Sequence, residues 1–147
     1  MPTAKLFTIG FTKKNAKTFF SKLRNAGVTK LIDIRLNNVS QLAGFAKRDD
    51  LIFFLSELCN CDYRHMPEFA PTKEILDAYK KKQIDWGEYV THFSRLIKER
   101  KIESKIGLEE LNNACLLCSE PTPEQCHRRL VAEYLREKIG DIEIKHL

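Results

Sequence analysis

Apolar residues recur along the chain with two different spacings, and the two spacings alternate. A β-prone run at 5–9 is followed by residues 15–26, whose apolar positions share one helical stripe: Ala16, Phe19, Phe20 and Leu23. Asn15 is the predicted N-cap of this helix and Gly27 its end, and a second β-prone run follows at 29–34. Strand, helix and strand in this order form a βαβ unit, which predicts parallel strands joined by a right-handed crossover.

The same alternation continues to the last residues. The pattern predicts helices at 48–58, 72–81, 85–100 and 123–139, and strands at 62–66, 113–118 and 141–146. The run at 113–118 is apolar throughout, as is typical of a strand at the centre of a parallel sheet. No linker or repeat interrupts the pattern. The sequence therefore predicts a single α/β domain over residues 1–147, with three layers and a mainly parallel open sheet of general Rossmann-like or flavodoxin-like architecture.

The composition is that of an ordinary globular protein, with 43% hydrophobic and 31% charged residues. No stretch approaches the roughly 20 apolar residues of a membrane span, so no membrane association is expected. The N-terminus lacks the apolar core of a secretion signal. Five cysteines, an odd number, favour reduced thiols over a disulfide framework. Together these features predict a cytoplasmic protein.

The charge balance points weakly to an anionic partner. The formal net charge is +5, and the basic residues cluster at 13–14, 80–82 and 98–101, where the spacing is typical of solvated helix faces. A small anionic ligand is the favoured partner, and nucleic acid is the alternative. A pure protein-interaction module is a third class. The sequence does not determine an oligomeric state.

Polar residues gather where the predicted strands end. In open parallel sheets, ligands bind at the carboxyl ends of the strands, next to helix N-termini. The predicted strand ends carry polar groups in four segments: 10–12, 33–35, 65–68 and 118–120. We expect the polar groups of three of these four segments to converge on one pocket.

The stretch CSEPTPEQCHRR at 118–129 predicts how the last helix begins. Thr122 is the expected N-cap, Pro123 the first helical residue, and Gln125 completes a capping box. At about 100° per residue, this start puts Arg128 at the edge of the apolar face and turns Arg129 to the opposite side. His127 then falls near the centre of the apolar face. We therefore expect Arg128 to reach the strand ends and Arg129 to be solvated.

Three cysteine chemistries compete at this stretch. A metal site would use Cys118, Cys126 and His127, but their spacing matches no common zinc motif, and helical phase would point Cys126 and His127 about 100° apart. Cys115 and Cys118 face opposite sides of a strand, which excludes a redox pair. Cys118 as a nucleophile remains open, since a helix dipole and Arg128 would lower its pKa. The alternative is that Cys118 only fills the core.

The favoured hypothesis is an anion-binding strand–turn–helix. Free N–H groups near 124–126 and the Arg128 side chain would face the ligand, and Arg35 would add a second bidentate contact. Glu120 is the candidate general acid or base, with the helix cap as its alternative role. Asp33 would be its charge partner or a second catalytic carboxylate, and His127 an orienting or proton-shuttling group. Hydrolysis or transfer of a phosphate-bearing substrate fits this set best. No cofactor is required, and a divalent metal held by Asp33 and Glu120 is compatible.

Several motifs resemble the DUF488 family along nearly the whole chain. They are Thr8-Ile-Gly10, Asp33-Ile-Arg35, Ser40, Phe45, the run Tyr63–Glu68, and Leu117–Glu120 followed by Cys126-His-Arg128. The chain departs from the family pattern at Phe11-Thr12, where Gly10 is usually followed by His-Ser, and at Asn37-Asn38, where a proline is usual. The resemblance implies a compact α/β fold with a polar pocket, and it implies no particular reaction.

The resulting candidate site has two groups of residues. The catalytic candidates are Glu120, Asp33, His127 and Cys118. The candidate ligand-binding residues are Gly10, Thr12, Arg35, Ser40, Cys126 and Arg128.

Overall fold

The structure is a computed structural model that describes residues 3–38, 44–119, 124 and 126–147. In these residues five strands form one sheet in which every neighbouring pair is parallel. The sheet order is β3-β2-β4-β1-β5. The strands are β1 (Ala4–Gly10), β2 (Lys30–Asp33), β3 (Asp62–His65), β4 (Ala114–Cys118) and β5 (Ile142–His146).

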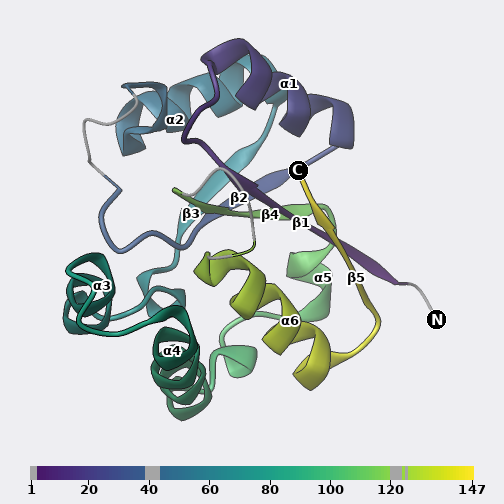
Figure 1. The fold of residues 1–147 in the computed structure, drawn as a ribbon. Coiled ribbons are helices and arrows are strands. Elements are labelled where there is room, and N and C mark those ends of the chain that lie inside the picture. The colour runs from purple at the N-terminus through teal and green to yellow at the C-terminus, as the bar shows by residue number, and fades with distance from the viewer. Residues whose placement is uncertain (1–2, 39–43, 120–123, 125) are drawn as a thin grey trace.

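Helices cover both faces of the sheet, which makes three layers (Figure 1). On one face lie α1 (Ala16–Ala26) and α2 (Arg48–Phe54), which continues as the π-helical turn η2 (Leu55–Cys59). The other face carries α3 (Lys73–Lys80), α4 (Trp86–Arg100), α5 (Leu108–Leu111) and α6 (His127–Ile139). Short 3₁₀ turns lie at η1 (Gly44–Ala46), η3 (Pro67–Phe69) and η4 (Ile102–Ser104). The predicted three-layer α/β fold is confirmed.

The central strand β4 is buried along its whole length, as its apolar sequence predicts. Its side chains alternate between two cores. Cys115 and Leu117 join the cluster beneath α1 and α2, and Leu116 and Cys118 join the cluster on the other face. Cys115 and Cys118 are therefore on opposite sides of the sheet, which confirms that they cannot form a C-x-x-C pair.

Local signals set the ends of α1 as predicted. Asn15 Oδ1 accepts a hydrogen bond from the Thr18 amide at 2.8 Å, and Gly27 ends the helix with φ 75°. The α4 start at Asp85 has a complete capping box with Glu88. These helices form where a side chain satisfies the free backbone groups.

The predicted start of the last helix is wrong. Helix α6 begins at His127, with Cys126 as an extended N-cap residue at φ −135° and ψ 139°. Cys126 is covalently tied to Cys118 at the end of β4, and this tertiary link holds Cys126 out of the helix. The capping residues Thr122, Pro123 and Gln125 lie outside the described residues.

The chain connections create a crevice at the carboxyl edge of the sheet. The connections after β1 and β2 carry α1 and α2 over one face, whereas those after β3 and β4 carry their helices over the other. Since β4 lies between β2 and β1, the loops diverge on both sides of its carboxyl end. Such switch points are where open α/β sheets bind ligands.

Across the described part of the chain, no helix combines the length and the apolar character that crossing a membrane requires.

Candidate functional site

A cavity of about 1000 Å³ lies at this carboxyl edge. Its sheet side is formed by the segments that follow β1, β2 and β4 and by the start of α6: Thr12, Arg35, Cys118, Ser119, Cys126 and His127. Its opposite side is formed by α3, the loop after it, and the first turn of α4. The volume is in the range of small-molecule sites.

A buried ion pair closes the end of β2. Arg35 Nε and Nη2 donate to the two carboxylate oxygens of Asp33, each at 2.8 Å, and Nη2 also donates to the Ala46 carbonyl. The side chains are 4% and 0% exposed, so the charges neutralise each other inside the protein. The Arg35 guanidinium also lies 5.3 Å from the Phe11 ring centroid. This pair explains why two charged residues can follow an apolar strand.

Tyr63 forms a further hydrogen bond to the Asp33 carboxylate. Its hydroxyl donates to Asp33 Oδ2 at 2.6 Å and accepts a hydrogen bond from Asn38 Nδ2 at 3.0 Å. Burial and the Asp33 carboxylate raise the pKa of Tyr63 well above its usual value, so the hydroxyl remains a donor at neutral pH. Both oxygens of Asp33 are thus engaged, which leaves this carboxylate poorly placed to hold a metal ion.

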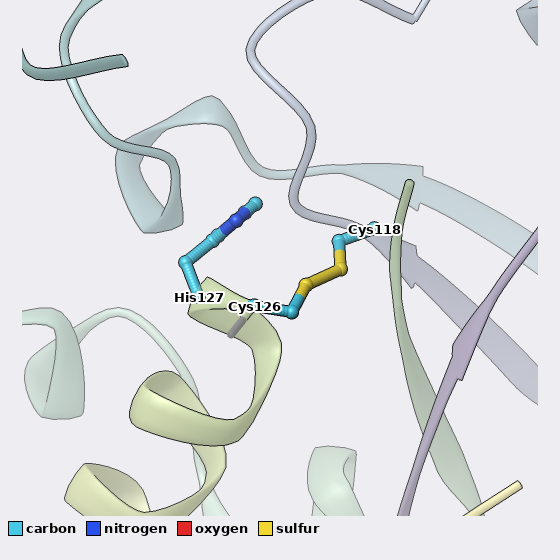
Figure 2. Close-up of side chains that lie close together, drawn as sticks. All are labelled: Cys118, Cys126 and His127. Carbon is cyan, nitrogen blue, oxygen red and sulfur yellow. A yellow bond between two sulfur atoms is a disulfide. The ribbon is translucent and has the colours of Figure 1, made fainter. Parts of the chain in front are cut away.

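Two cysteines meet at the end of β4. Cys118, the last residue of β4, and Cys126, the N-cap of α6, form a disulfide (Figure 2). The expectation of reduced thiols is therefore wrong for this pair, because folding brings together two cysteines that are separated by a turn. It holds for Cys59, Cys61 and Cys115, which are free. Burial raises the pKa of Cys61 to about 12 and raises that of Cys115 too, so both stay protonated.

Arg128 lies behind the sulfur pair and is 1% exposed. Its Nη1 is 3.5 Å from Cys118 Sγ and 4.0 Å from Cys126 Sγ, and its Nε donates to Thr8 Oγ1 at 3.2 Å. Arg129, in contrast, is part-exposed and pairs with Glu133 one turn further along α6. The predicted difference in burial between the two arginines is confirmed, but Arg128 faces the sulfurs rather than the cavity, because it lies behind the disulfide.

Thr8, which contacts Arg128, also contacts His146 in the last strand, β5. Thr8 Oγ1, which accepts from Arg128, also lies within hydrogen-bond distance of His146 Nδ1, at 2.6 Å. Burial, and then the positive charge of Arg128, lower the pKa of His146. The contacts of Thr8 with Arg128 and His146 help to hold the Arg128 guanidinium in place.

His127 is fixed by a backbone contact at the first residue of α6. Its Nε2 is 2.7 Å from the carbonyl oxygen of Ile34, and since a carbonyl only accepts, Nε2 carries the proton. The ring also packs edge-on against Phe93, with centroids 5.7 Å apart. Burial lowers the pKa of His127 to about 4, and the Ile34 carbonyl only partly opposes this effect. The imidazole is neutral at physiological pH, with Nδ1 unprotonated.

Cys118, Cys126 and His127 converge more closely than helical phase predicts. One ligand atom from each lies within 4.8 Å of the others. The expected 100° divergence of Cys126 and His127 assumed that both were helical, whereas Cys126 is extended. Figure 2 shows the sulfur pair and the imidazole side by side at the start of α6.

Three aromatic side chains line the opposite wall. Trp86 and Tyr89 are stacked, with centroids 4.9 Å apart and 16° between the planes. Tyr79 from α3 packs against both, at 5.7 and 5.1 Å. Lys80 and Lys82 line the same cavity. The sequence reasoning treated this region as an ordinary helix pair and missed the wall.

Most of the candidate site residues lie at this edge. Gly10 and Cys118 are directly paired in register, and Asp33 pairs with Leu117. Thr12, Arg35, Cys126 and His127 line the cavity, whereas Arg128 lies behind the disulfide, outside the lining. Glu120 and Ser40 fall outside the described residues.

Sequence reasoning assigned no role to Thr8, Tyr63 or His146. Thr8 and Tyr63 lie in motifs that resemble the family, which was the available signal. His146 could not be found in this way, because only the pairing of β5 with β1 brings it to Thr8.

Comparisons with known proteins place the chain in a family. No curated protein and no solved structure matches it. The family model described as domain of unknown function DUF488 matches residues 15–135, which is most of the chain. The matched region contains the Asp33–Arg35 pair, the disulfide and Arg128. The chain therefore belongs to the DUF488 family.

Proposed function

We propose that the chain binds an anionic, phosphate-bearing small molecule in the cavity at the carboxyl edge of the sheet. The observation that carries this proposal is the cavity itself, which has a guanidinium on its sheet side and an aromatic wall opposite. Hydrolysis or transfer of the phosphate-bearing group is the reaction class that suits such a pocket.

Arg35 supports the anion part of the proposal. Asp33 and the Ala46 carbonyl engage its Nε and Nη2, and no described residue accepts from Nη1. Because Arg35 lines the cavity, Nη1 is the donor that remains for a ligand oxygen. Asp33 fixes the orientation of the guanidinium, so that less ordering entropy is lost on binding.

The aromatic wall favours a ligand that also has a planar ring. Stacking on an aromatic side chain contributes about 1–3 kcal/mol per base in nucleic-acid complexes. Lys80 and Lys82 add positive charge to the cavity lining, although Asp85 and Glu88, which also line it, offset part of this charge. A nucleotide combines both features. In this proposal Glu120 is the general acid or base, and His127, neutral and fixed by Ile34, orients the reacting group.

Ligand binding tests the proposal directly. Thermal shift and calorimetric titrations compare a nucleoside monophosphate, the matching nucleoside and inorganic phosphate, each with and without Mg²⁺. We expect the nucleotide to bind most tightly. Trp86→Leu should weaken nucleotide binding by about tenfold or more and leave phosphate binding unchanged. Arg35→Lys should weaken the binding of both phosphate-bearing ligands. A lysine ammonium cannot bind Asp33 through two nitrogens and still offer a third nitrogen to the ligand.

Two controls keep this test specific. Arg64→Lys replaces an exposed arginine outside the cavity and should leave binding unchanged. Glu120→Gln should abolish turnover but not binding.

If no phosphate-bearing ligand stabilises the wild type, the proposal is wrong. Equal affinity for short oligonucleotides, with a steep loss in salt, would instead favour a nucleic-acid partner.

A thiol-dependent enzyme is the second candidate function. The observation in its favour is that Cys118 and Cys126 line the cavity with the Arg128 guanidinium behind them, which lowers a thiol pKa. Rapid loss of activity on alkylation of the reduced protein would support this candidate. Unchanged activity after complete alkylation would reject it.

A further inference from the structure

We propose that Cys118 and Cys126, when reduced, form with His127 a binding site for a divalent metal ion of the zinc type on the sheet side of the cavity. The structure shows the oxidised form of this pair. Thiolate and imidazole are the ligands that zinc favours in proteins. The inference does not depend on the proposed function, because metal binding can be measured without any other ligand.

The distances suit one ion. The three ligand atoms lie within 4.8 Å of one another, and ligands of a tetrahedral zinc ion are roughly 3.5–3.8 Å apart. The Cα atoms of Cys118 and Cys126 are 7.4 Å apart, beyond the roughly 4.4–6.8 Å found in most disulfides. At this Cα separation, two reduced cysteine side chains can place their sulfurs on opposite sides of one ion.

His127 is already oriented as a metal ligand. Ligating histidines donate their other ring N–H to a carboxylate or a backbone carbonyl, which fixes the ring and its tautomer. Here Nε2–H donates to the Ile34 carbonyl at 2.7 Å, which leaves Nδ1 as the nitrogen available to the ion. Ile34 directly follows β2, so the sheet itself holds the imidazole.

Positive groups lie beside both sulfurs. Arg128 Nη1 points at both, at 3.5 and 4.0 Å, so its charge would offset the negative charge of two thiolate ligands. Cys126 is the N-cap of α6, a helix of 13 residues, so its sulfur also lies at the positive end of the helix dipole. Thr8 and His146 keep Arg128 in this orientation.

The site has three protein ligands and borders a cavity. Structural zinc sites close the coordination shell with four residues, whereas reactive sites keep one position for water or substrate. Among the described residues no fourth cysteine, histidine or carboxylate joins the group. Because Cys118, Cys126 and His127 all line the cavity, a position kept for water or substrate would face it, and an ion there would polarise an oxygen of an entering ligand.

Metal content of the full-length protein provides the test. The disulfide is first reduced with a phosphine, which becomes the phosphine oxide with oxygen from water while the sulfurs gain two electrons and two protons. The reduced protein is dialysed against Zn²⁺ and then against metal-free buffer. We expect one zinc per chain in the wild type. The oxidised protein should hold none, because its sulfurs are bonded to each other.

Matched variants assign the ligands. Cys118→Ser and Cys126→Ser should each reduce bound zinc to less than about a tenth of the wild-type amount. His127→Gln should weaken zinc binding by about 100-fold or more. Cys59→Ser makes the same substitution at a free cysteine outside the cavity and should retain full zinc content. Zinc content unchanged in Cys118→Ser would show adventitious binding elsewhere and would overturn the proposal.

A second measurement on the wild type avoids variants that fail to fold. Zinc should slow alkylation of Cys118 and Cys126, followed by mass spectrometry of their peptides, and should leave the alkylation rate of Cys59 unchanged. Cobalt in place of zinc should produce a sulfur-to-metal charge-transfer band. The site does not exist if the reduced wild-type protein binds no zinc and the metal leaves the alkylation rates of Cys118 and Cys126 unchanged. A nucleophilic thiol then becomes the better explanation of this pair of cysteines.

Discussion

The chain buries two arginines at the same edge of the sheet, and their surroundings differ sharply. Arg35, after β2, has a permanent carboxylate partner, since Asp33 binds it bidentately and Tyr63 binds Asp33. Arg128, in the first turn of α6, instead faces two sulfur atoms and Thr8. The charge of an aspartate is constant near neutral pH. The charge of the sulfurs depends on whether they are bonded to each other, protonated or bound to a metal.

This difference separates a fixed region from a responsive one. The ion pair at the end of β2 should contribute the same stability under oxidising and reducing conditions. The interaction of Arg128 with the sulfurs should become stronger when thiolates form, because a charge-assisted contact is roughly twice as strong as a neutral one. The comparison predicts four measurable effects.

The largest effect should follow from breaking the fixed pair. Asp33→Ala leaves the buried Arg35 guanidinium without its carboxylate and should lower the free energy of unfolding by about 3–5 kcal/mol. The measurement is chemical denaturation, with and without reductant, and the loss should be equal in both. The control is Glu110→Ala, which breaks an exposed ion pair with Arg64 and should cost about 1 kcal/mol or less.

Arg128→Ala should be the next largest, at about 2–4 kcal/mol in the oxidised protein, because it removes a fully buried side chain and the Thr8 contact. Arg129→Ala, its neighbour in sequence, should cost about 1 kcal/mol or less. The cost of Arg128→Ala should rise in the reduced protein, unlike that of Asp33→Ala. A cost independent of reductant would remove the distinction between the two regions.

Acid should destabilise the responsive region. His127 has a pKa of about 4 in the folded protein and about 6.5 when unfolded, so its contribution is present above pH 6.5 and is lost as the pH falls towards 4. Between about pH 7 and 4.5 the loss should be roughly 2 kcal/mol. Denaturation of the oxidised protein in EDTA checks this, and His127→Gln should have a correspondingly flatter pH profile. His146→Gln should flatten it too, by less.

The smallest effect should come from Tyr63→Phe. The change removes one hydrogen bond to the Asp33 carboxylate but leaves both contacts from Arg35, so about 1–2 kcal/mol should be lost. Chemical denaturation measures it, with Tyr134→Phe as the control, because Tyr134 donates to Glu103, which is only part-buried. A loss as large as that of Asp33→Ala would mean that Tyr63, rather than Arg35, holds the carboxylate in place.

The sequence was most informative where structure depends on near neighbours. The periodicity of apolar residues predicted every strand of the described sheet, and Asn15 and Gly27 marked both ends of α1. It predicted that the strand ends would gather polar groups and that Arg128 and Arg129 would differ. These features depend on residues within a few positions of each other.

The rest depends on contacts between distant segments. The start of α6 at His127 goes with the link between Cys126 and Cys118, two residues that are eight positions apart in the sequence. The orientation of His127 depends on Ile34, and that of Arg128 on Thr8 and ultimately His146. No local pattern contains this information, and the metal geometry was misjudged for the same reason.

The strand order also has a consequence for synthesis of the chain. In the described sheet, strand β1 pairs with β4 and β5 alone, which begin at Ala114 and Ile142. At ribosomal rates of about 5–20 residues per second, β1 therefore waits on the order of 5–20 seconds for its first partner. Meanwhile Leu6, Phe7 and Ile9, all buried in the finished fold, remain open to other chains. The yield of folded protein should thus depend on translation speed and on chaperones that shield the first strand.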